Sequence, residues 1–239
     1  MLTQQTTDKL YDLRLKGMAR SYQDQLSRAD VSGLTFDERL ALLVDQEWHL
    51  RKERRTARRL KDANLKQAAC VEDIDFRHPR GLDRHQILDL AACNWIRAHR
   101  NLILTGPTGL GKSWIANALC DKACREGYTA RYARVPMLAY EVSIARADGS
   151  LVPYLKKLSK TNVLVLDDWG LNPLSGQAQH DLLEIVDDRV GTGSTIVTSQ
   201  LPTAAWHETV ADASVADALL DRLLGSAIKI EMKGESLRK

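Results

Sequence analysis

The pattern of apolar residues differs between the two parts of this chain, with strands and helices expected in the second part and helices alone in the first. From about residue 84 onward, short apolar runs typical of buried parallel strands alternate with stretches at helical spacing. Strands are expected over 102–104, 128–134, 162–170, 195–200 and 228–230. Helices are expected over 84–99, from about 112, and over 136–147, 151–159, 177–190 and 216–224. Alternating strands and helices predict an α/β fold with a parallel sheet flanked by helices.

Before residue 84 the pattern predicts helices only. Apolar positions recur at helical spacing over residues 5–30 and again from about 36 to 65. Thr35 and Glu38 form a capping-box pattern at the start of the second helix. Residues 68–84 break helical periodicity. We therefore expect a small all-α N-terminal domain over 1–67, a linker over 68–84 and an α/β domain over 85–239.

A glycine-rich stretch directly follows the first expected strand. Residues 106–113 read Gly-Pro-Thr-Gly-Leu-Gly-Lys-Ser, which matches the phosphate-binding loop pattern, with a strand before it and a helix after it. Glycines allow the chain to curl so that its N–H groups converge on phosphate. Lys112 can reach the β- and γ-phosphates, and the Ser113 hydroxyl can bind magnesium. The expected nucleotide-binding residues are Gly106, Pro107, Thr108, Gly109, Leu110, Gly111, Lys112, Ser113 and Trp114.

Two acids end the apolar run at 162–170. A carboxylate at the carboxyl end of a buried strand can hold magnesium, so we assign Asp167 to the metal site with Ser113. Asp168 would orient or activate the attacking water, although exposed acids can also simply cap a strand. On the expected strand over 195–200, Gln200 or Ser199 is a candidate to contact the γ-phosphate or its water. The sequence thus predicts a Mg²⁺-dependent enzyme that hydrolyses ATP.

The second half of the long N-terminal helix is rich in basic residues. The stripe consists of Arg51, Lys52, Arg54, Arg55, Arg58 and Arg59. Binding to an anionic membrane is disfavoured, because the opposite face lacks bulky apolar residues. A solvated face with salt bridges, contact with an acidic partner protein, and contact with nucleic-acid phosphate remain open. We favour nucleic-acid phosphate.

Composition and charge add limits to this interpretation. Residues 1–82 carry 16 Lys and Arg against 13 Asp and Glu, whereas the remainder carries 18 of each, so all of the net charge of +3 is N-terminal. No apolar run is long enough to cross a bilayer, and the N-terminal residues do not resemble a signal peptide. The four cysteines include no metal-binding pair. We expect a cytoplasmic protein.

The motifs together resemble those of AAA+ ATPases (P-loop NTPases of the ASCE group), and most closely the IstB family. Members of that family are helper ATPases encoded beside the transposase of bacterial insertion sequences. The resemblance covers essentially the whole chain, although most AAA+ proteins carry Asp-Glu where this chain has Asp167 and Asp168. It is carried by residues 15–19, the arginine-rich helix, and residues 81–84, 106–113, 166–170, 198–202, 221–223 and 234–236.

The resemblance implies a shared site and several partners. Arg222 matches an arginine that reaches the γ-phosphate of a neighbouring subunit, and Arg238 a further phosphate-sensing arginine. The family has little or no helical lid. Its members form oligomers on duplex DNA, bend it and deliver it to the transposase. A DnaC-type helicase loader, which shares the ATPase core, is the alternative. A nucleotide kinase would need a lid with several arginines, which the sequence lacks.

Overall fold

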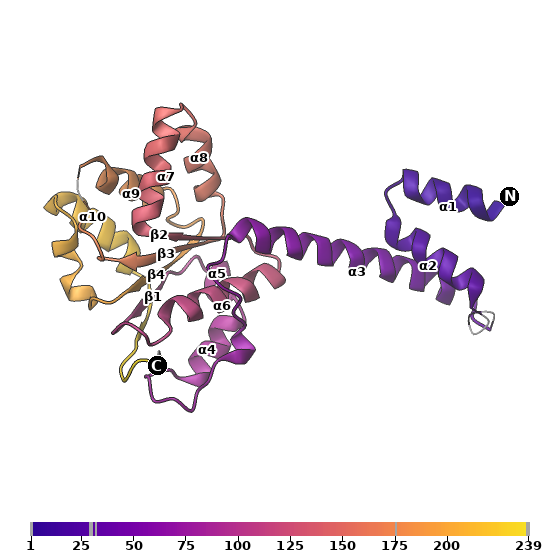
Figure 1. Cartoon of the computed structure of the whole chain (residues 1–239), viewed down its shortest axis with the longest axis horizontal. Coiled ribbons are helices and arrows are strands. Elements are labelled where there is room, and N and C mark those ends of the chain that lie inside the picture. Colours follow the sequence, from indigo (N-terminus) through magenta and orange to yellow (C-terminus); the bar gives the residue numbers. More distant parts are fainter. Residues whose placement is uncertain (1, 29–30, 32, 175, 238–239) are drawn as a thin grey trace. The chain divides into compact units, whose positions relative to one another are not determined.

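The computed structural model describes residues 2–28, 31, 33–174 and 176–237 (Figure 1). Within it the chain forms two compact units, with the boundary between Arg58 and Arg59. Across the described residues, no helix is both long enough and apolar enough to cross a membrane.

The second unit is built on five parallel strands in the order β2-β3-β4-β1-β5. They are β1 Leu102–Thr105, β2 Ala130–Arg134, β3 Val163–Trp169, β4 Ser194–Ser199 and β5 Ile228–Glu231. Their helices are α4 Arg84–Ala91, α5 Asn94–Arg97, α6 Lys112–Arg125, α7 Val135–Ala147, α8 Leu151–Ser159, α9 Gln177–Asp187 and α10 Ala213–Leu224. The predicted α/β architecture is therefore confirmed.

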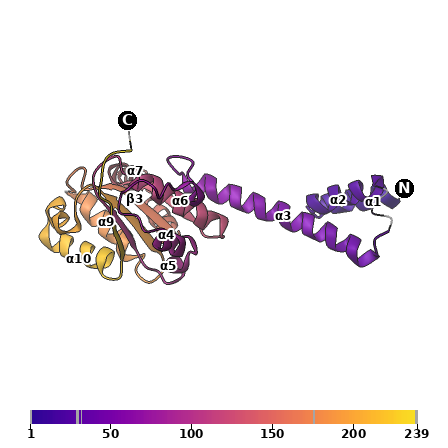
Figure 2. The ribbon, with the colours of Figure 1, turned by 90° about the horizontal axis from the view of Figure 1, so that it is seen from below.

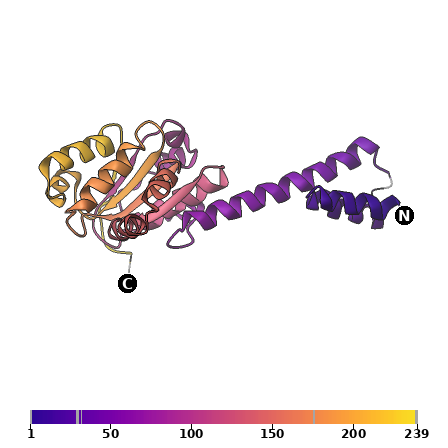
Figure 3. The same ribbon diagram turned by 90° about the horizontal axis from the view of Figure 1, so that it is seen from above.

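Helices cover both faces of this sheet, which explains why its strands are continuous apolar runs (Figures 2 and 3). Alternate residues of one strand enter different cores. Leu102 and Leu104 pack with α4 and α6, whereas Ile103 packs in the cluster formed with α7, α9 and α10. Because both faces of the sheet are covered, a ligand can reach the strands only at the carboxyl or the amino edge of the sheet.

The first unit contains α1 Leu2–Asp12, α2 Lys16–Ser27 and most of α3 Phe36–Ala63. At the start of α3 the predicted capping box is present, because Thr35 N donates to Glu38 Oε2 at 2.8 Å and Glu38 N to Thr35 Oγ1 at 3.4 Å. Helix α2 crosses α3 at Gly17, where an added Cβ would come within 2.7 Å of Glu47 Cα. Only glycine therefore permits this close contact.

Two predicted helices are interrupted, so the prediction of helix throughout 5–30 and 84–99 was wrong. The first breaks at Arg14, which has φ 60°, and α2 ends at Ser27; residues 29–30 lie outside the described part. The second breaks at Cys93, also at φ 60°. In both places the side-chain pattern stays helical although the backbone leaves the helical conformation. Hydrophobic spacing alone does not reveal such a left-handed residue.

Residues 68–84, expected as a linker, belong to the second unit and contribute to its core. A short 3-10 helix spans Val71–Asp73, and Ala69, Val71 and Ile74 are buried in the core beside α4 and α6. Phe76 packs at the edge of the same core. This segment therefore forms part of the wall around the site.

Candidate functional site

The glycine-rich loop between β1 and α6 has the backbone conformation that its sequence predicts. Gly106, Gly109 and Gly111 have φ of 137°, 86° and 87°, in the region that favours glycine. Space is equally restrictive, since an added Cβ would come within 2.1 Å of Met232 O at Gly106 and 2.0 Å of Ser236 Oγ at Gly109. The segment that follows β5 therefore packs directly on the loop and holds its shape.

Lys112 begins α6 and folds back over this loop. Its ammonium donates to Gly106 O at 2.6 Å and to Pro107 O at 2.8 Å, and the residue is only 8% exposed. The side chain of Leu110 is fully buried in the core. The loop thus presents backbone N–H groups and one cation at the positive end of a helix, which is the usual arrangement of an anion site.

Asp167, near the end of β3, is fully buried and accepts hydrogen bonds from three hydroxyl groups. Ser113 Oγ donates to its Oδ1 at 2.7 Å. Thr198 on β4 donates to the same oxygen, and Tyr132 on β2 donates to Oδ2. Burial and the hydrogen bond to Asp167 raise the pKa of the Tyr132 phenol, which therefore stays protonated as a donor. The predicted pair Ser113 and Asp167 is thus in direct contact.

The backbone conformation changes at Asp168, so its side chain points in a different direction from that of Asp167. Asp168 has φ 62°, and the pairing of β3 with β4 shifts register between Leu166 and Trp169, as in a β-bulge. Its Oδ2 accepts from Arg134 Nε at 2.7 Å, and this hydrogen bond raises the pKa of Arg134. The bulge points the second carboxylate into the pocket while the first stays buried.

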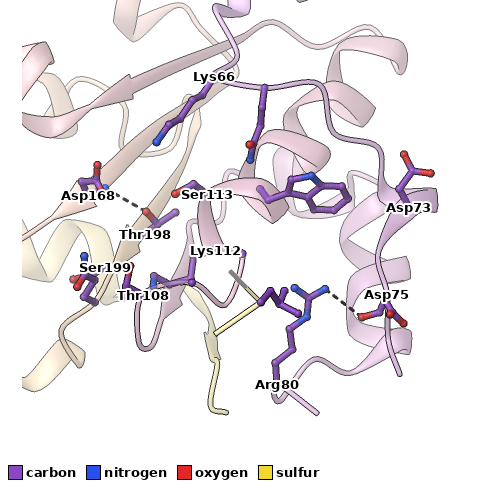
Figure 4. Close-up of a pocket in the computed structure, with 16 residues that line it drawn as sticks. Lys66, Asp73, Asp75, Arg80, Thr108, Lys112, Ser113, Asp168, Thr198 and Ser199 are labelled. Carbon is purple, nitrogen blue, oxygen red and sulfur yellow. Dashed lines mark hydrogen bonds between the residues drawn. The ribbon is translucent and has the colours of Figure 1, made fainter. Parts of the chain in front are cut away.

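A pocket of about 510 Å³ opens at this carboxyl edge of the sheet (Figure 4). From the predicted site it includes Thr108, Gly109, Gly111, Lys112, Ser113, Trp114, Asp168, Ser199 and Gln200. Ser199 Oγ donates to Trp169 O at 2.8 Å and accepts from Leu201 N, so its hydroxyl is used within the fold. Gln200 is exposed, which leaves it as the better candidate of the two to contact a ligand.

The rest of the pocket wall comes from residues that the sequence did not single out. They are Lys66, Gln67, Asp73, Asp75, Arg80, Thr198 and Leu237. Arg80 is 4% exposed, donates to Leu110 O at 2.9 Å and to Asp75 O at 3.2 Å, and so ties the 75–80 segment to the glycine-rich loop. Its burial lowers the pKa of the guanidinium. Arg238 lies outside the described residues.

Arg222 lies at the opposite, amino edge of the sheet. Its carbonyl accepts from the side chain of Asn101, which immediately precedes β1, at 3.0 Å, whereas the glycine-rich loop follows the other end of that strand. Arg222 is in the last turn of α10, pairs with Asp187 at the end of α9, and does not line the 510 Å³ pocket. The structure thus separates Arg222 from the other predicted site residues of the same chain.

The basic stripe lies on the second half of α3. Arg51, Lys52, Arg54, Arg55 and Arg58 are exposed. Two of these side chains are engaged within the first unit: Arg51 pairs with Glu47 at 2.6 Å, and Lys52 lies 5.0 Å from the ring centre of Trp48. Arg54 and Arg55 have no hydrogen-bonding or ionic partner among the described residues. Arg59 belongs to the second unit and donates to Cys124 O at 3.5 Å.

The donor atoms around Asp167 suit magnesium better than a softer metal. Ser113 and Asp167 offer hard oxygen ligands, and the described residues contain no cluster of three His, Cys, Asp or Glu that could hold a metal by itself. Mg²⁺ usually takes one or two protein oxygens and completes its coordination with phosphates and water. A metal held here would therefore arrive with a phosphorylated ligand.

Comparison with known proteins identifies the family to which this chain belongs. A model of the family described as IstB-like ATP binding protein matches residues 8–239. The chain is similar to an insertion sequence ATP-binding protein of Sinorhizobium fredii, y4pL. The two are 47% identical over 239 residues, which cover 100% of this chain and 98% of y4pL.

Solved structures of other proteins share a fold with about 70% of this chain. The crystal structure of DnaI has a TM-score of 0.59 at 21% identity, covering 69% of this chain and 91% of that one. The DnaC helicase loader has a TM-score of 0.52 at 19% identity, with 73% and 99% covered. These likenesses confirm the predicted fold, a parallel sheet flanked by helices.

Proposed function

This chain belongs to the IstB-like ATP-binding proteins of insertion sequences, and from that premise we propose that it is a Mg²⁺-dependent ATPase that assembles on duplex DNA and serves a transposase. The observation that carries the enzymatic part is the 2.7 Å hydrogen bond between Ser113 and Asp167. It joins the glycine-rich loop to the acidic strand, so a metal bound there would meet both the protein and the phosphates.

In this proposal the loop amides and the start of α6 bind the triphosphate. Lys112 exchanges its bonds to Gly106 O and Pro107 O for the β- and γ-phosphates. Magnesium held by Ser113 and Asp167 would neutralise charge on the phosphate oxygens. Asp168 and Gln200, both on the pocket wall, would orient the attacking water, and release of Asp168 from Arg134 would free its carboxylate for this role.

The position of Arg222 supports a site shared between two subunits. At the amino edge it cannot serve its own loop, but it can be offered to the loop of a neighbouring copy. An arginine supplied in trans is worth roughly 10³–10⁵ in rate. We therefore propose an oligomer in which one subunit binds ATP and the next completes the site, with Arg238 as a second sensor of the phosphate.

A mixing experiment tests the shared site. Asp168→Asn should bind ATP but hydrolyse it poorly, and Arg222→Ala should keep an intact pocket but lack the donated arginine. With ATP, Mg²⁺ and duplex DNA, each variant alone should be slow and an equimolar mixture should recover part of the wild-type rate. Full DNA-stimulated hydrolysis by Arg222→Ala alone would overturn the proposal. Size-exclusion chromatography should show large oligomers only when ATP and duplex are both present.

The DNA-binding part rests on the exposed cations of α3. If about six phosphates are neutralised, affinity for duplex should fall roughly 10³-fold between 50 and 200 mM salt. Changing Arg54, Arg55 and Arg58 to alanine should reduce the salt slope by about 3. Lys9→Ala with Arg20→Ala, which also removes charge from the first unit, is the matched control and should change the slope much less. An unaltered slope in the triple variant would exclude α3 as the DNA surface.

A helicase-loader function is the second candidate, supported by the likeness of fold to the DnaC helicase loader. It predicts capture of a replicative helicase rather than a transposase, and a preference for single-stranded DNA. Parallel pull-downs with the two partner proteins, together with binding to single- and double-stranded oligonucleotides of equal length, separate the two functions.

A further inference from the structure

The surroundings of Arg222 contain a carboxylate in a locally unfavourable place. Asp187 is the last residue of α9, where the negative end of the helix dipole disfavours an acid and favours a base. Its side chain nevertheless pairs with Arg222 Nε and remains 56% exposed. An exposed ion pair of this kind contributes little to folding stability. The pairing is therefore better explained by what it does to Arg222.

The two contacts of the Arg222 side chain leave its terminal nitrogens available. Arginine has five N–H donors. Nε donates to Asp187, and Nη1 donates to Ala218 O at 2.9 Å, one turn earlier in α10. Among the described residues three donors are thus unused, all of them on the two terminal nitrogens. These form the fork that binds phosphate oxygens in a bidentate manner.

Both helices that carry this pair are fastened to the sheet. Asn101 donates to the carbonyls of Arg222 and Leu223 at 3.0 and 3.2 Å and accepts from Thr195 N at 2.9 Å, which fixes the end of α10. Arg189, two residues after Asp187 and 2% exposed, donates to the carbonyls of Leu158, Thr161 and Ser194, which fixes the end of α9. The carboxylate and the guanidinium are therefore held on rigid supports.

We infer that Asp187 is a positioning residue that orients the Arg222 guanidinium, so that its terminal N–H groups are presented to a nucleotide phosphate bound by a neighbouring copy of this chain. The inference rests on the proposed shared site and adds to it the residue that aims the donated arginine. Asp187 itself does not touch the nucleotide. It reduces the conformational freedom that a long arginine side chain would otherwise lose on reaching the phosphate.

A double-mutant cycle on the full chain tests this role, with DNA-stimulated ATP hydrolysis as the readout. Asp187→Asn should lower kcat roughly 10- to 100-fold, as expected for a misplaced catalytic group, while ATP affinity and oligomer size remain those of wild type. Asp187→Glu should recover part of the loss. Asp188→Asn, which removes the adjacent exposed acid, is the matched control and should stay within about twofold of wild type.

The combined variant decides whether Asp187 acts through Arg222. Asp187→Asn added to Arg222→Ala should cost no further rate, because the group that Asp187 orients is already absent. An additive loss, or a kcat for Asp187→Asn within twofold of wild type, would overturn the inference while leaving the shared site intact. Full activity of Arg222→Ala would instead overturn the shared site, and this inference with it.

Discussion

The two units each contain a buried carboxylate, and their partners differ in kind. Glu47 in the helical unit is 6% exposed and accepts from Gly17 N at 2.6 Å, from Met18 N and from Arg51. Asp167 in the α/β unit is fully buried and accepts hydrogen bonds from the hydroxyls of Ser113, Thr198 and Tyr132. One acid is bound by a cation and by the first amides of a helix, the other by neutral side chains.

This difference separates a structural acid from one that is available to a ligand. Glu47 accepts from peptide N–H groups at the start of α2, so it caps α2 and links it to α3. Its negative charge is already balanced by the guanidinium of Arg51. Hydroxyl groups rotate easily and do not neutralise the charge of Asp167. A divalent cation would supply the balancing positive charge, which is why Asp167 suits a metal site.

The largest difference between Asp167 and Glu47 is expected in ATP hydrolysis, when each carboxylate is replaced by an amide of the same size. Asp167→Asn should lower DNA-stimulated ATP hydrolysis by roughly 10³-fold, because several kcal/mol of metal-dependent charge stabilisation would be lost. Glu47→Gln should leave ATP affinity unchanged. Steady-state hydrolysis and equilibrium ATP binding measure the two effects. Similar ATP turnover in Asp167→Asn and wild type would show that the two acids do not differ in this way.

The converse contrast concerns folding of the helical unit. Glu47→Ala should leave two amides at the start of α2 and the Arg51 guanidinium without their partner, at a cost of about 3 kcal/mol. Hydrogen exchange of the α2 amides measures this locally. Exchange within the α/β unit should be unaffected, and it serves as the internal control. Protection of α2 equal to that of wild type would show that Glu47 is not the cap.

The smallest effect is a dependence on pH. Burial of Glu47 opposes its ionisation, but the hydrogen bonds from Arg51, Gly17 and Met18 outweigh this and hold its pKa below the ordinary value of 4.5. Because the folded pKa is the lower one, the stabilisation is complete above pH 4.5 and is lost as pH falls through the folded value. Protection of α2 should decline in that acidic range in wild type. In Glu47→Gln this component of the decline should be absent.

Local patterns predicted the parts of the site that lie within one stretch of chain. The glycine-rich loop requires positive φ at three glycines, a property that sequence spacing reveals, and the acids Asp167 and Asp168 directly follow an apolar run. Tyr132 and Arg80 were missed because they come from segments in which the sequence showed no site motif, and Thr198 was passed over beside the candidates Ser199 and Gln200. The expected strand over 128–134 and the buried strand over 162–170 contained a signal for Tyr132, since adjacent parallel strands would place their carboxyl-end residues side by side.

The sequence by itself determined the order of strands and helices, the phosphate-loop geometry, the paired acids and the excess positive charge near the N-terminus, because these depend on periodicity and on residues close together in the chain. Only the tertiary structure decided that α2 crosses α3 at Gly17, that three hydroxyls from different segments surround Asp167, and that Arg222 lies across the sheet from its own loop beside Asp187. These arrangements depend on how strands and helices pack, which brings together residues with no regular spacing along the chain.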